Sequence, residues 1–294
     1  MRILLFGAAG QLGSEILASS GEQGIAIVGL TRRDVDITDA TAVARAIEAE
    51  GPSLVVNASA YTAVDQAEKE RDLAEAVNGR APGFMAAACA STGIPLVHFS
   101  TDYVFDGTKT GAYVETDPVA PLGAYGESKL AGEEAVRARL AEHLILRTSW
   151  VYGFYGRNFL KTILRLANER DALTIVADQR GCPTATRDLA GAIFIAAQQV
   201  AQGGANWGTY HLAGQGATTW HGFATAIVAA AQPFTGRSPT VKAITTADYP
   251  TPARRPANSE LDSSRFAEAF GFRAAPWQQR VEDCVSGLMR GREP

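Results

Sequence analysis

The chain has 294 residues, 46% of them hydrophobic and 20% charged, so it is long enough to bury the core of one large domain or of two unequal ones. Its 27 Lys and Arg against 31 Asp and Glu give a formal net charge of −4 without a local basic run, which argues against a nucleic-acid partner. Its three cysteines, Cys89, Cys182 and Cys284, are far apart and suggest neither a disulfide framework nor a zinc site. The first apolar run is too short for a signal peptide or a membrane span, so we expect a soluble, cytoplasmic protein that does not bind membranes.

Short apolar strands alternate with helical patterns along the first half of the chain. Strands are expected over residues 3–6, 25–30, 54–57, 96–100 and 143–148, and helices over residues 12–19, 40–50, 73–92 and 125–141. Apolar runs without polar alternation are typical of strands buried on both faces of a parallel sheet. The order therefore predicts an α/β fold with a doubly wound parallel sheet of the Rossmann type.

The pattern loosens after residue 150, where Gly- and Pro-rich turns separate the elements. Helices are expected over residues 158–169 and 186–202, and a strand over residues 173–176. Residues 245–259 hold three prolines and no periodicity, which predicts an ordered loop or a linker. We therefore expect a smaller, mixed α/β region in the C-terminal half.

A glycine motif follows the first predicted strand. Gly7, Gly10 and Gly13 form a GxxGxxG pattern that leads into a helix, with Gln11 and Leu12 before the last glycine. Such glycines let the backbone approach a pyrophosphate, which the free N–H groups and the dipole of a helix N-terminus favour. Because the motif lies in a strand–helix–strand unit, we prefer dinucleotide binding to a tight turn without a ligand.

Charged residues at the end of the second predicted strand bear on the choice of cofactor. Arg32 and Arg33 come first, followed by Asp34 and Asp36. A carboxylate here would bind the ribose hydroxyls of NAD, whereas an arginine would accept the 2′-phosphate of NADP. With Arg32 and Asp36 as the candidate contacts, the sequence favours NADPH and leaves NADH open.

The most specific local motif is the pair of Tyr125 and Lys129, which project from the same face of a predicted helix. An ammonium beside a phenol favours the phenolate and lowers the tyrosine pKa towards neutrality, as a proton donor to a carbonyl needs. Thr101, at the end of an earlier strand, can place a hydroxyl beside Tyr125. The three residues predict acid catalysis, in preference to an exposed helical pair without a function.

Several segments together resemble the extended short-chain dehydrogenase/reductases, and among them the dTDP-4-dehydrorhamnose reductases. They are the glycine motif, residues 57–65 (NASAYTAVD), residues 100–107 (STDYVFDG), the YxxxK motif and residues 147–153 (RTSWVYG). Residues 158–159, 178–184, 210–212 and 249–256 are also similar to that subgroup, so the likeness covers nearly the whole chain.

The resemblance implies reduction of the C4 keto group of dTDP-4-dehydro-β-L-rhamnose by NADPH or NADH to give dTDP-L-rhamnose, which serves cell-surface polysaccharide synthesis. It implies that Tyr125 donates the proton, that Lys129 holds the nicotinamide ribose and tunes Tyr125, and that Thr101 hydrogen-bonds the reacting oxygen. We accordingly expect a dinucleotide-binding domain over residues 1–152 and a mainly substrate-binding region over residues 153–294, with some segments returning to the first domain.

The resemblance also implies which other side chains line the site. The cofactor cleft would be lined by residues that follow the third strand: Asn57, Ala58, Ala60 and Tyr61. The sugar nucleotide would be faced by Thr101, Asp102, Tyr103, Trp150, Asn158 and Arg255. Arg255 would act as a bidentate donor to the diphosphate, although a solvated loop arginine is an equal alternative from the sequence alone.

Two questions stay open at this point. Some relatives hold Mg²⁺ at a dimer interface through acidic residues, and Glu15 matches the first of these, but Arg187 stands at or near the second, so we predict no obligatory metal and leave a homodimer open. A non-catalytic subunit, like the regulatory β-subunit of methionine adenosyltransferase, or a nucleotide-sugar epimerase or dehydratase would share the fold. The intact set of Thr101, Tyr125 and Lys129 favours the reductase, whereas Asp102 keeps the dehydratase open.

Overall fold

The structure, a computed structural model, describes residues 1–291, with only the backbone of Glu22. Its main feature is a six-stranded sheet in the order β10–β5–β4–β3–β1–β2, in which every pairing is parallel. The strands are β1 (Arg2–Phe6), β2 (Ala26–Leu30), β3 (Leu54–Asn57), β4 (Leu96–Thr101), β5 (His143–Thr148) and β10 (Gly208–His211). The chain runs outwards from β1 in both directions, which confirms the predicted doubly wound sheet and places a topological switch point between β1 and β3.

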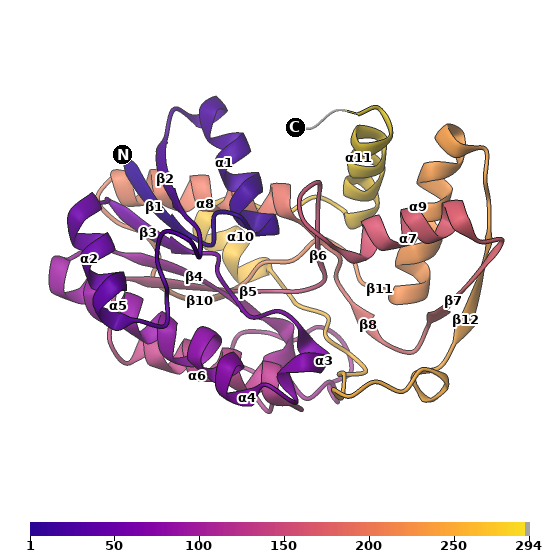
Figure 1. The fold of residues 1–294 in the computed structure, drawn as a ribbon, viewed down its shortest axis with the longest axis horizontal. Helices are drawn as coiled ribbons and strands as arrows, with labels where there is room; N and C mark the ends of the chain where they lie inside the picture. Colours follow the sequence, from indigo (N-terminus) through magenta and orange to yellow (C-terminus); the bar gives the residue numbers. More distant parts are fainter. Residues whose placement is uncertain (292–294) are drawn as a thin grey trace.

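Helices cover both faces of this sheet (Figure 1). One face carries α1 (Gln11–Gln23), α8 (Thr186–Ala201) and α10 (Ser264–Phe270); the other carries α2 (Ala40–Glu50), α5 (Ala81–Thr92) and α6 (Ala124–Arg137). Strand β1 shows why the sequence lacked alternation: Ile3 and Leu5 enter the first core while Leu4 and Phe6 enter the second, and none of the four side chains is more than 1% exposed.

The long helix predicted over residues 73–92 is interrupted. The structure has α3 (Val64–Ala67), α4 (Arg71–Ala74) and a π-helical turn, η1 (Glu75–Arg80), before α5. Pro82 lies in the first turn of α5 and has no N–H to donate to the carbonyl of Asn78, four residues earlier, so the helix widens there.

A smaller region with its own core lies beside the sheet (Figure 1). It contains α7 (Phe159–Glu169), α9 (Trp220–Thr235), α11 (Trp277–Met289) and the parallel pair β7 (Ala172–Val176) and β12 (Thr240–Ile244). Two short pairings complete it: β6 (Val151–Tyr152) with β9 (Thr184–Ala185), and β8 (Arg180–Gly181) with β11 (Thr218–Thr219). Between these elements the chain returns to the sheet, where β10 joins β5 and α8 packs on α1.

The proline-rich segment is an ordered loop. It contains the 3₁₀ turn η3 (Thr246–Asp248), and its ends are fixed by the carboxylate of Asp178, which accepts from the N–H of Thr246 at 2.9 Å, and by a bridge between Asn258 and Arg180. A second 3₁₀ turn, η2 (Asp102–Val104), follows β4.

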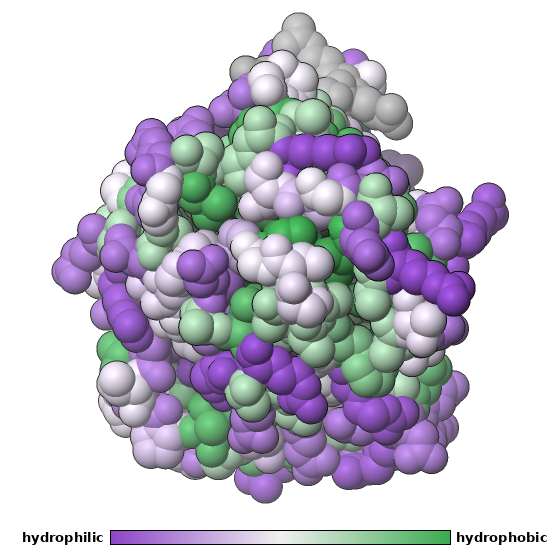
Figure 2. All heavy atoms as spheres, turned by 90° about the vertical axis from the view of Figure 1, so that its left-hand side faces the viewer, coloured by the Kyte–Doolittle hydropathy of each residue, from purple (hydrophilic) through white to green (hydrophobic). Residues whose placement is uncertain are grey.

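The surface mixes charged and apolar side chains, as Figure 2 shows for the end of the molecule at the left of Figure 1. Within residues 1–291, no helix combines the length and the apolar character needed to cross a bilayer.

Candidate active site

The predicted site residues lie where strands of the sheet end. Because parallel strands end at the same edge, Gly7 after β1, the loop after β3, and Thr101 at the end of β4 come together beside the switch point. This edge faces the smaller region (Figure 1).

The glycine loop is packed so closely that only glycine fits. Gly7 has φ +84°, and a Cβ there would lie 2.6 Å from the backbone nitrogen of Ser59; a Cβ on Gly13 would lie 2.8 Å from the Cα of Ala8. Gly10 precedes α1 and provides no side-chain cap, so the first N–H groups of the helix have no side-chain acceptor. Such a cradle at a helix N-terminus fits the pyrophosphate of a dinucleotide.

The two residues between these glycines differ in role. The side chain of Leu12 is buried in the core, so only its backbone is available to a ligand. Gln11 accepts a hydrogen bond from the amide of Asn158 at 3.1 Å, and Asn158 in turn caps α7 by accepting from the N–H of Lys161 at 3.0 Å. Asn158 therefore joins the glycine loop to the smaller region.

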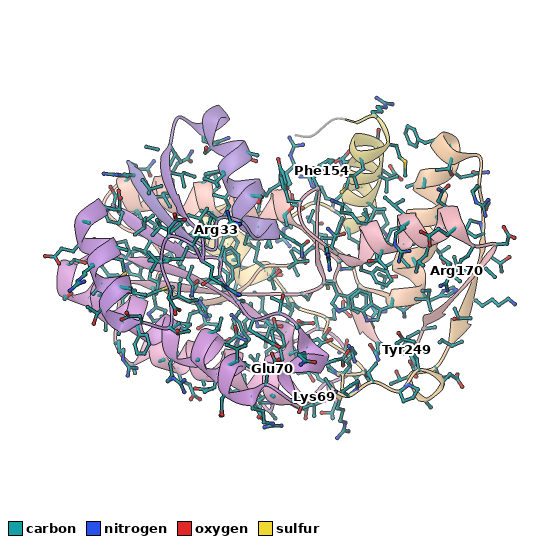
Figure 3. The ribbon with its side chains drawn as sticks, in the orientation of Figure 1. Arg33, Lys69, Glu70, Phe154, Arg170 and Tyr249 are labelled. Carbon is teal, nitrogen blue, oxygen red and sulfur yellow. The ribbon has the colours of Figure 1, made fainter. Side chains whose placement is uncertain are left out.

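The charged residues after β2 are not equally available. Asp34 accepts from the N–H and hydroxyl of Thr31, and Asp36 accepts from those of Thr38, and these bonds lower the pKa of both carboxyls. Arg32 is exposed, and Arg33 lies beyond the carboxyl end of β2 (Figure 3). Since both carboxylates are held in local turns, the arginines are freer than the carboxylates to contact a ligand such as the 2′-phosphate that distinguishes NADP from NAD.

The loop after β3 is held by buried polar contacts. Asn57 donates to Nδ1 of His98 at 3.1 Å and accepts from the N–H of Ser59 at 3.0 Å, and Ala58 and Ala60 follow on the same loop. His98 is fully buried, and burial lowers its pKa well below its usual value, so His98 is a neutral core residue.

Asn78 is a residue that sequence reasoning missed. From the π-helical turn its side chain accepts from the N–H of Tyr61 at 2.8 Å and donates to the carbonyl of Tyr61 at 3.0 Å and to the hydroxyl of Ser128 at 3.1 Å. It therefore fixes the β3 loop against α6. The phenol of Tyr61 donates to Glu70 at 2.6 Å, which raises the Tyr61 pKa to about 12.

Thr101 and Tyr125 meet at the start of α6. The Thr101 side chain lies within hydrogen-bonding reach of the phenol of Tyr125 and partly opposes the rise in pKa that burial causes there. The ring of Tyr103 packs edge-on against that of Tyr125 with centroids 5.7 Å apart. Gly126 permits this approach, because a Cβ there would lie 2.9 Å from Pro121 and would collide with the carbonyl of Tyr103. The predicted convergence of hydroxyl and phenol is present.

The predicted effect of Lys129 on Tyr125 is wrong for this structure. Burial raises the pKa of Tyr125 to about 12, despite the hydrogen bond with Thr101, and the nearby Asp102 raises it further. The ammonium of Lys129 donates to the carbonyl of Phe99 at 2.6 Å, and burial lowers its own pKa to about 8. Spacing placed the two groups on one helix face, but desolvation, which depends on the tertiary structure, dominates the pKa of the phenol.

Glu133 extends the same helix face by one more turn. Its fully buried carboxylate accepts from the hydroxyl of Ser100 at 2.6 Å and from Nε and Nη2 of Arg147 at 2.8 and 2.7 Å. Arg137 donates to it at 3.0 Å, and the pKa of Glu133 is lowered by Arg147, Ser100 and Arg137 against the effect of burial. Glu133 thus anchors α6 to β4 and β5 next to Thr101. A spacing of four residues from Lys129 was the signal that could have found it.

Asp102 is buried beside these groups. Its Oδ1 accepts from the hydroxyl of Thr101 at 3.0 Å, whereas Oδ2 has no hydrogen-bond partner among the described residues. Burial raises the pKa of Asp102 to about 7. A buried carboxyl with a free oxygen in a cleft is typical of a functional site.

Trp150 adopts a strained backbone conformation. Its φ of +47° lies in the left-handed region, where a tryptophan is uncommon. Its indole stacks on Trp220 with ring centroids 3.6 Å apart, and Gly181 makes room for it, since a Cβ there would lie 2.5 Å from the indole. Trp150 is therefore held between the end of the sheet and the smaller region.

Arg255 is engaged within the protein. Its guanidinium forms a two-pronged ion pair with Asp65 at 2.9 and 3.1 Å, rather than extending into solvent as a free loop arginine would. The ion pair joins two of the segments that carried the family resemblance.

Comparison with known proteins identifies the family. The family model described as "RmlD substrate binding domain" matches residues 1–290. The dTDP-4-dehydrorhamnose reductase of Burkholderia thailandensis is 46% identical over 297 residues, which cover 98% of this chain and 99% of that one. The chain belongs to the dTDP-4-dehydrorhamnose reductase family.

Solved structures of the family share the whole fold. The dTDP-4-dehydrorhamnose reductase of Clostridium acetobutylicum superposes with a TM-score of 0.91 at 37% identity and covers 98% of this chain and 99% of its own. The one from Bacillus anthracis, solved in complex with NADP, gives 0.89 at 34% identity and covers 97% and 98%.

Glu15, which was considered for Mg²⁺, and Asp188, the acidic residue next to Arg187, make other contacts in this member of the family. Glu15 is buried and accepts from the hydroxyl of Thr186 at 2.7 Å, and burial raises its pKa. Asp188 pairs with Arg280 at 2.7 Å. Within residues 1–291, no three His, Cys, Asp or Glu side chains are grouped so that they could hold a metal ion.

Proposed function

We propose that this protein reduces the C4 keto group of dTDP-4-dehydro-β-L-rhamnose to give dTDP-L-rhamnose, with NADPH preferred and NADH accepted. The observation that carries the proposal is the meeting of Thr101 and Tyr125, with Lys129 one turn further along α6, beside a glycine cradle at the switch point of the sheet. The names of the family members, and the NADP in the Bacillus anthracis structure, support it.

The cofactor site is proposed from the cradle outwards. Gly7, Gly10 and Gly13 admit the pyrophosphate to the N-terminus of α1, with Gln11 and the backbone of Leu12 beside it, and Arg32 binds the 2′-phosphate. Asp36, Asn57, Ala58, Ala60 and Tyr61 line the remaining cleft. When bound, the reduced nicotinamide supplies the hydride.

The phenol of Tyr125 supplies the proton. Because burial raises its pKa to about 12, the phenol is fully protonated at neutral pH. During the reduction, negative charge develops on O4, and Tyr125 transfers its proton to that oxygen. The hydroxyl of Thr101, which donates to Oδ1 of Asp102 in this structure, turns to donate a hydrogen bond to O4. The ammonium of Lys129, one helical turn along α6, is assigned to the hydroxyls of the nicotinamide ribose.

The sugar nucleotide occupies the side of the site that faces the smaller region. We assign its contacts to Asp102, Tyr103, Trp150, Asn158 and Arg255. Asp102 contributes Oδ2, which has no hydrogen-bond partner among the described residues and which a sugar hydroxyl would satisfy.

The cellular setting is part of the same proposal. We place the protein in the cytoplasm, which agrees with the three free, buried cysteines. No metal is required, and the oligomeric state is left open.

The test is cofactor oxidation, followed by absorbance of the reduced nicotinamide, with purified protein and dTDP-4-dehydro-β-L-rhamnose. Oxidation that needs both sugar and protein, with dTDP-L-rhamnose identified by mass spectrometry and NMR, is the expected result. Parallel reactions with NADPH and NADH rank the cofactors. Cofactor binding without sugar-dependent oxidation would instead favour the non-catalytic subunit or another nucleotide-sugar enzyme.

A further inference from the structure

Asp65 and Arg255 are 190 residues apart in the sequence, yet their side chains form an ion pair. Asp65 lies in α3, directly after the loop that follows β3, and Arg255 lies in the ordered segment 245–259. Figure 1 shows this segment crossing from the smaller region back to the sheet.

Both oxygens of Asp65 hold the same piece of chain. Oδ1 accepts from Nη1 of Arg255 at 3.1 Å and from the backbone N–H of Ala253 at 3.2 Å, and Oδ2 accepts from Nη2 of Arg255 at 2.9 Å. The guanidinium also donates to the hydroxyl of Thr251. Arg255 and the N–H of Ala253 lower the pKa of Asp65, so this carboxylate is charged at neutral pH.

The held segment forms a wall of the site. A small pocket is lined by Tyr103 and Tyr125 on one side and by Ala253 and Pro256 on the other. Burial lowers the pKa of Arg255, but the ion pair with Asp65 and the nearby phenol of Tyr103 raise it, so the guanidinium lies close to the residue whose ring packs on Tyr125.

A second contact fixes the same segment independently. A Cβ on Gly107 would lie 2.5 Å from the Cβ of Pro256, so the loop after η2 packs directly against the segment. The ion pair is therefore one of two attachments, and its loss should loosen residues 251–256 without unfolding the protein.

We propose that Asp65 is a positioning residue whose ion pair with Arg255 straps residues 251–256 against Tyr103 and Tyr125, and so sets the affinity for the sugar nucleotide. The inference rests on the proposed function for its substrate. The side chains of Asp65 and Arg255 are 41% and 21% exposed, so the pair adds little to global stability and its effect belongs to the site.

The kinetic test compares Asp65→Asn, Arg255→Gln and the double variant. Asp65→Asn should raise KM for the sugar nucleotide about 5-fold, the factor that about 1 kcal/mol gives for a partly exposed bidentate pair. Arg255→Gln should raise KM at least as much, because it also removes a side chain assigned to the substrate. The kcat and the Kd for NADPH should change less than about 2-fold. The double variant should have the KM of Arg255→Gln alone, because both single substitutions remove the same ion pair.

Asp72→Asn is the matched control, since it removes one exposed carboxylate from the next helix, α4, and should leave KM unchanged. Fully additive single-variant effects, or an unchanged KM in Asp65→Asn, would overturn the proposal. A lowered KM would do so as well, since Asp65 would then compete with the substrate for Arg255.

Hydrogen exchange tests the strap without turnover. In Asp65→Ala the amides of residues 249–258, and that of Ala253 above all, should exchange at least about 5-fold faster, while those of β4 remain unchanged. Unchanged exchange in this segment would overturn the strap. If the wild-type protein fails to oxidise cofactor with the sugar, the proposed function fails, and the exchange result still decides whether Asp65 holds the segment.

Discussion

Among single substitutions near the site, Glu133→Ala should lower the free energy of unfolding the most. It removes the acceptor of hydrogen bonds from Ser100, Arg137 and Arg147. Arg147 is 4% exposed, and its Nη1 already lacks a partner among the described residues, so its charge would stay buried without compensation. Breaking a buried pair in this way costs about 3–5 kcal/mol, a large share of the ~5–15 kcal/mol that stabilises a typical protein.

The measurement is the free energy of unfolding in urea, followed by circular dichroism. Glu134→Ala is the control, because Glu134 is the exposed neighbour on the same helix and should change stability by less than about 0.5 kcal/mol. The double variant Glu133→Gln with Arg147→Met removes both charges and should recover most of the loss. A loss below about 1 kcal/mol in Glu133→Ala would refute the reasoning.

The same carboxylate also acts on Lys129. Glu133 raises the pKa of Lys129, which burial holds at about 8, so its removal lowers that pKa further. If the proposed mechanism needs the ammonium, activity falls as pH rises through this pKa, and in Glu133→Gln the fall occurs at lower pH than in the wild type. If activity in Glu133→Gln falls at the same pH as in the wild type, Glu133 does not control the charge state of Lys129.

Three further outcomes are expected. Tyr125→Phe should lower turnover on the order of 100-fold or more with NADPH binding nearly intact, whereas retained turnover in a kinetic assay would remove Tyr125 from the mechanism. Gly13→Ala should weaken NADPH binding at least about 10-fold in a fluorescence titration, because the added Cβ meets the backbone at Ala8; tight binding would contradict the cradle. Asp102→Asn should gain stability relative to the wild type as pH rises from about 4 to 7, since the raised pKa of Asp102 makes the folded wild type less stable by ~1.4 kcal/mol per pH unit in that window; a flat difference in urea unfolding would show that the pKa is not raised.

Local patterns were enough for five of the six strands of the sheet and for part of the site; β10, which joins β5 at the edge, was not predicted. The four buried residues of β1 could be predicted as an interior strand because both faces of that strand enter a core. The spacing of Tyr125 and Lys129 put both on one face of α6, since helix geometry fixes that relation regardless of the rest of the fold.

Relations between distant segments could not be predicted in the same way. The bonds of Asn78 to Tyr61, and of Asp65 to Arg255, join side chains whose own surroundings in the sequence give no sign of the partner. The raised pKa of Tyr125 depends on desolvation by the whole site, which spacing does not report. The π-helical turn, by contrast, has a local cause, because Pro82 has no N–H to donate to the carbonyl of Asn78.

The stacked indoles of Trp150 and Trp220 both pack against the core of the smaller region, although they come from distant parts of the chain. Trp150 stands two residues after β5 of the sheet, and Trp220 is the first residue of α9. The stack therefore fixes the point at which the chain leaves the sheet and enters the smaller region. Any rearrangement of this connection will change the near-ultraviolet circular dichroism of the indole pair.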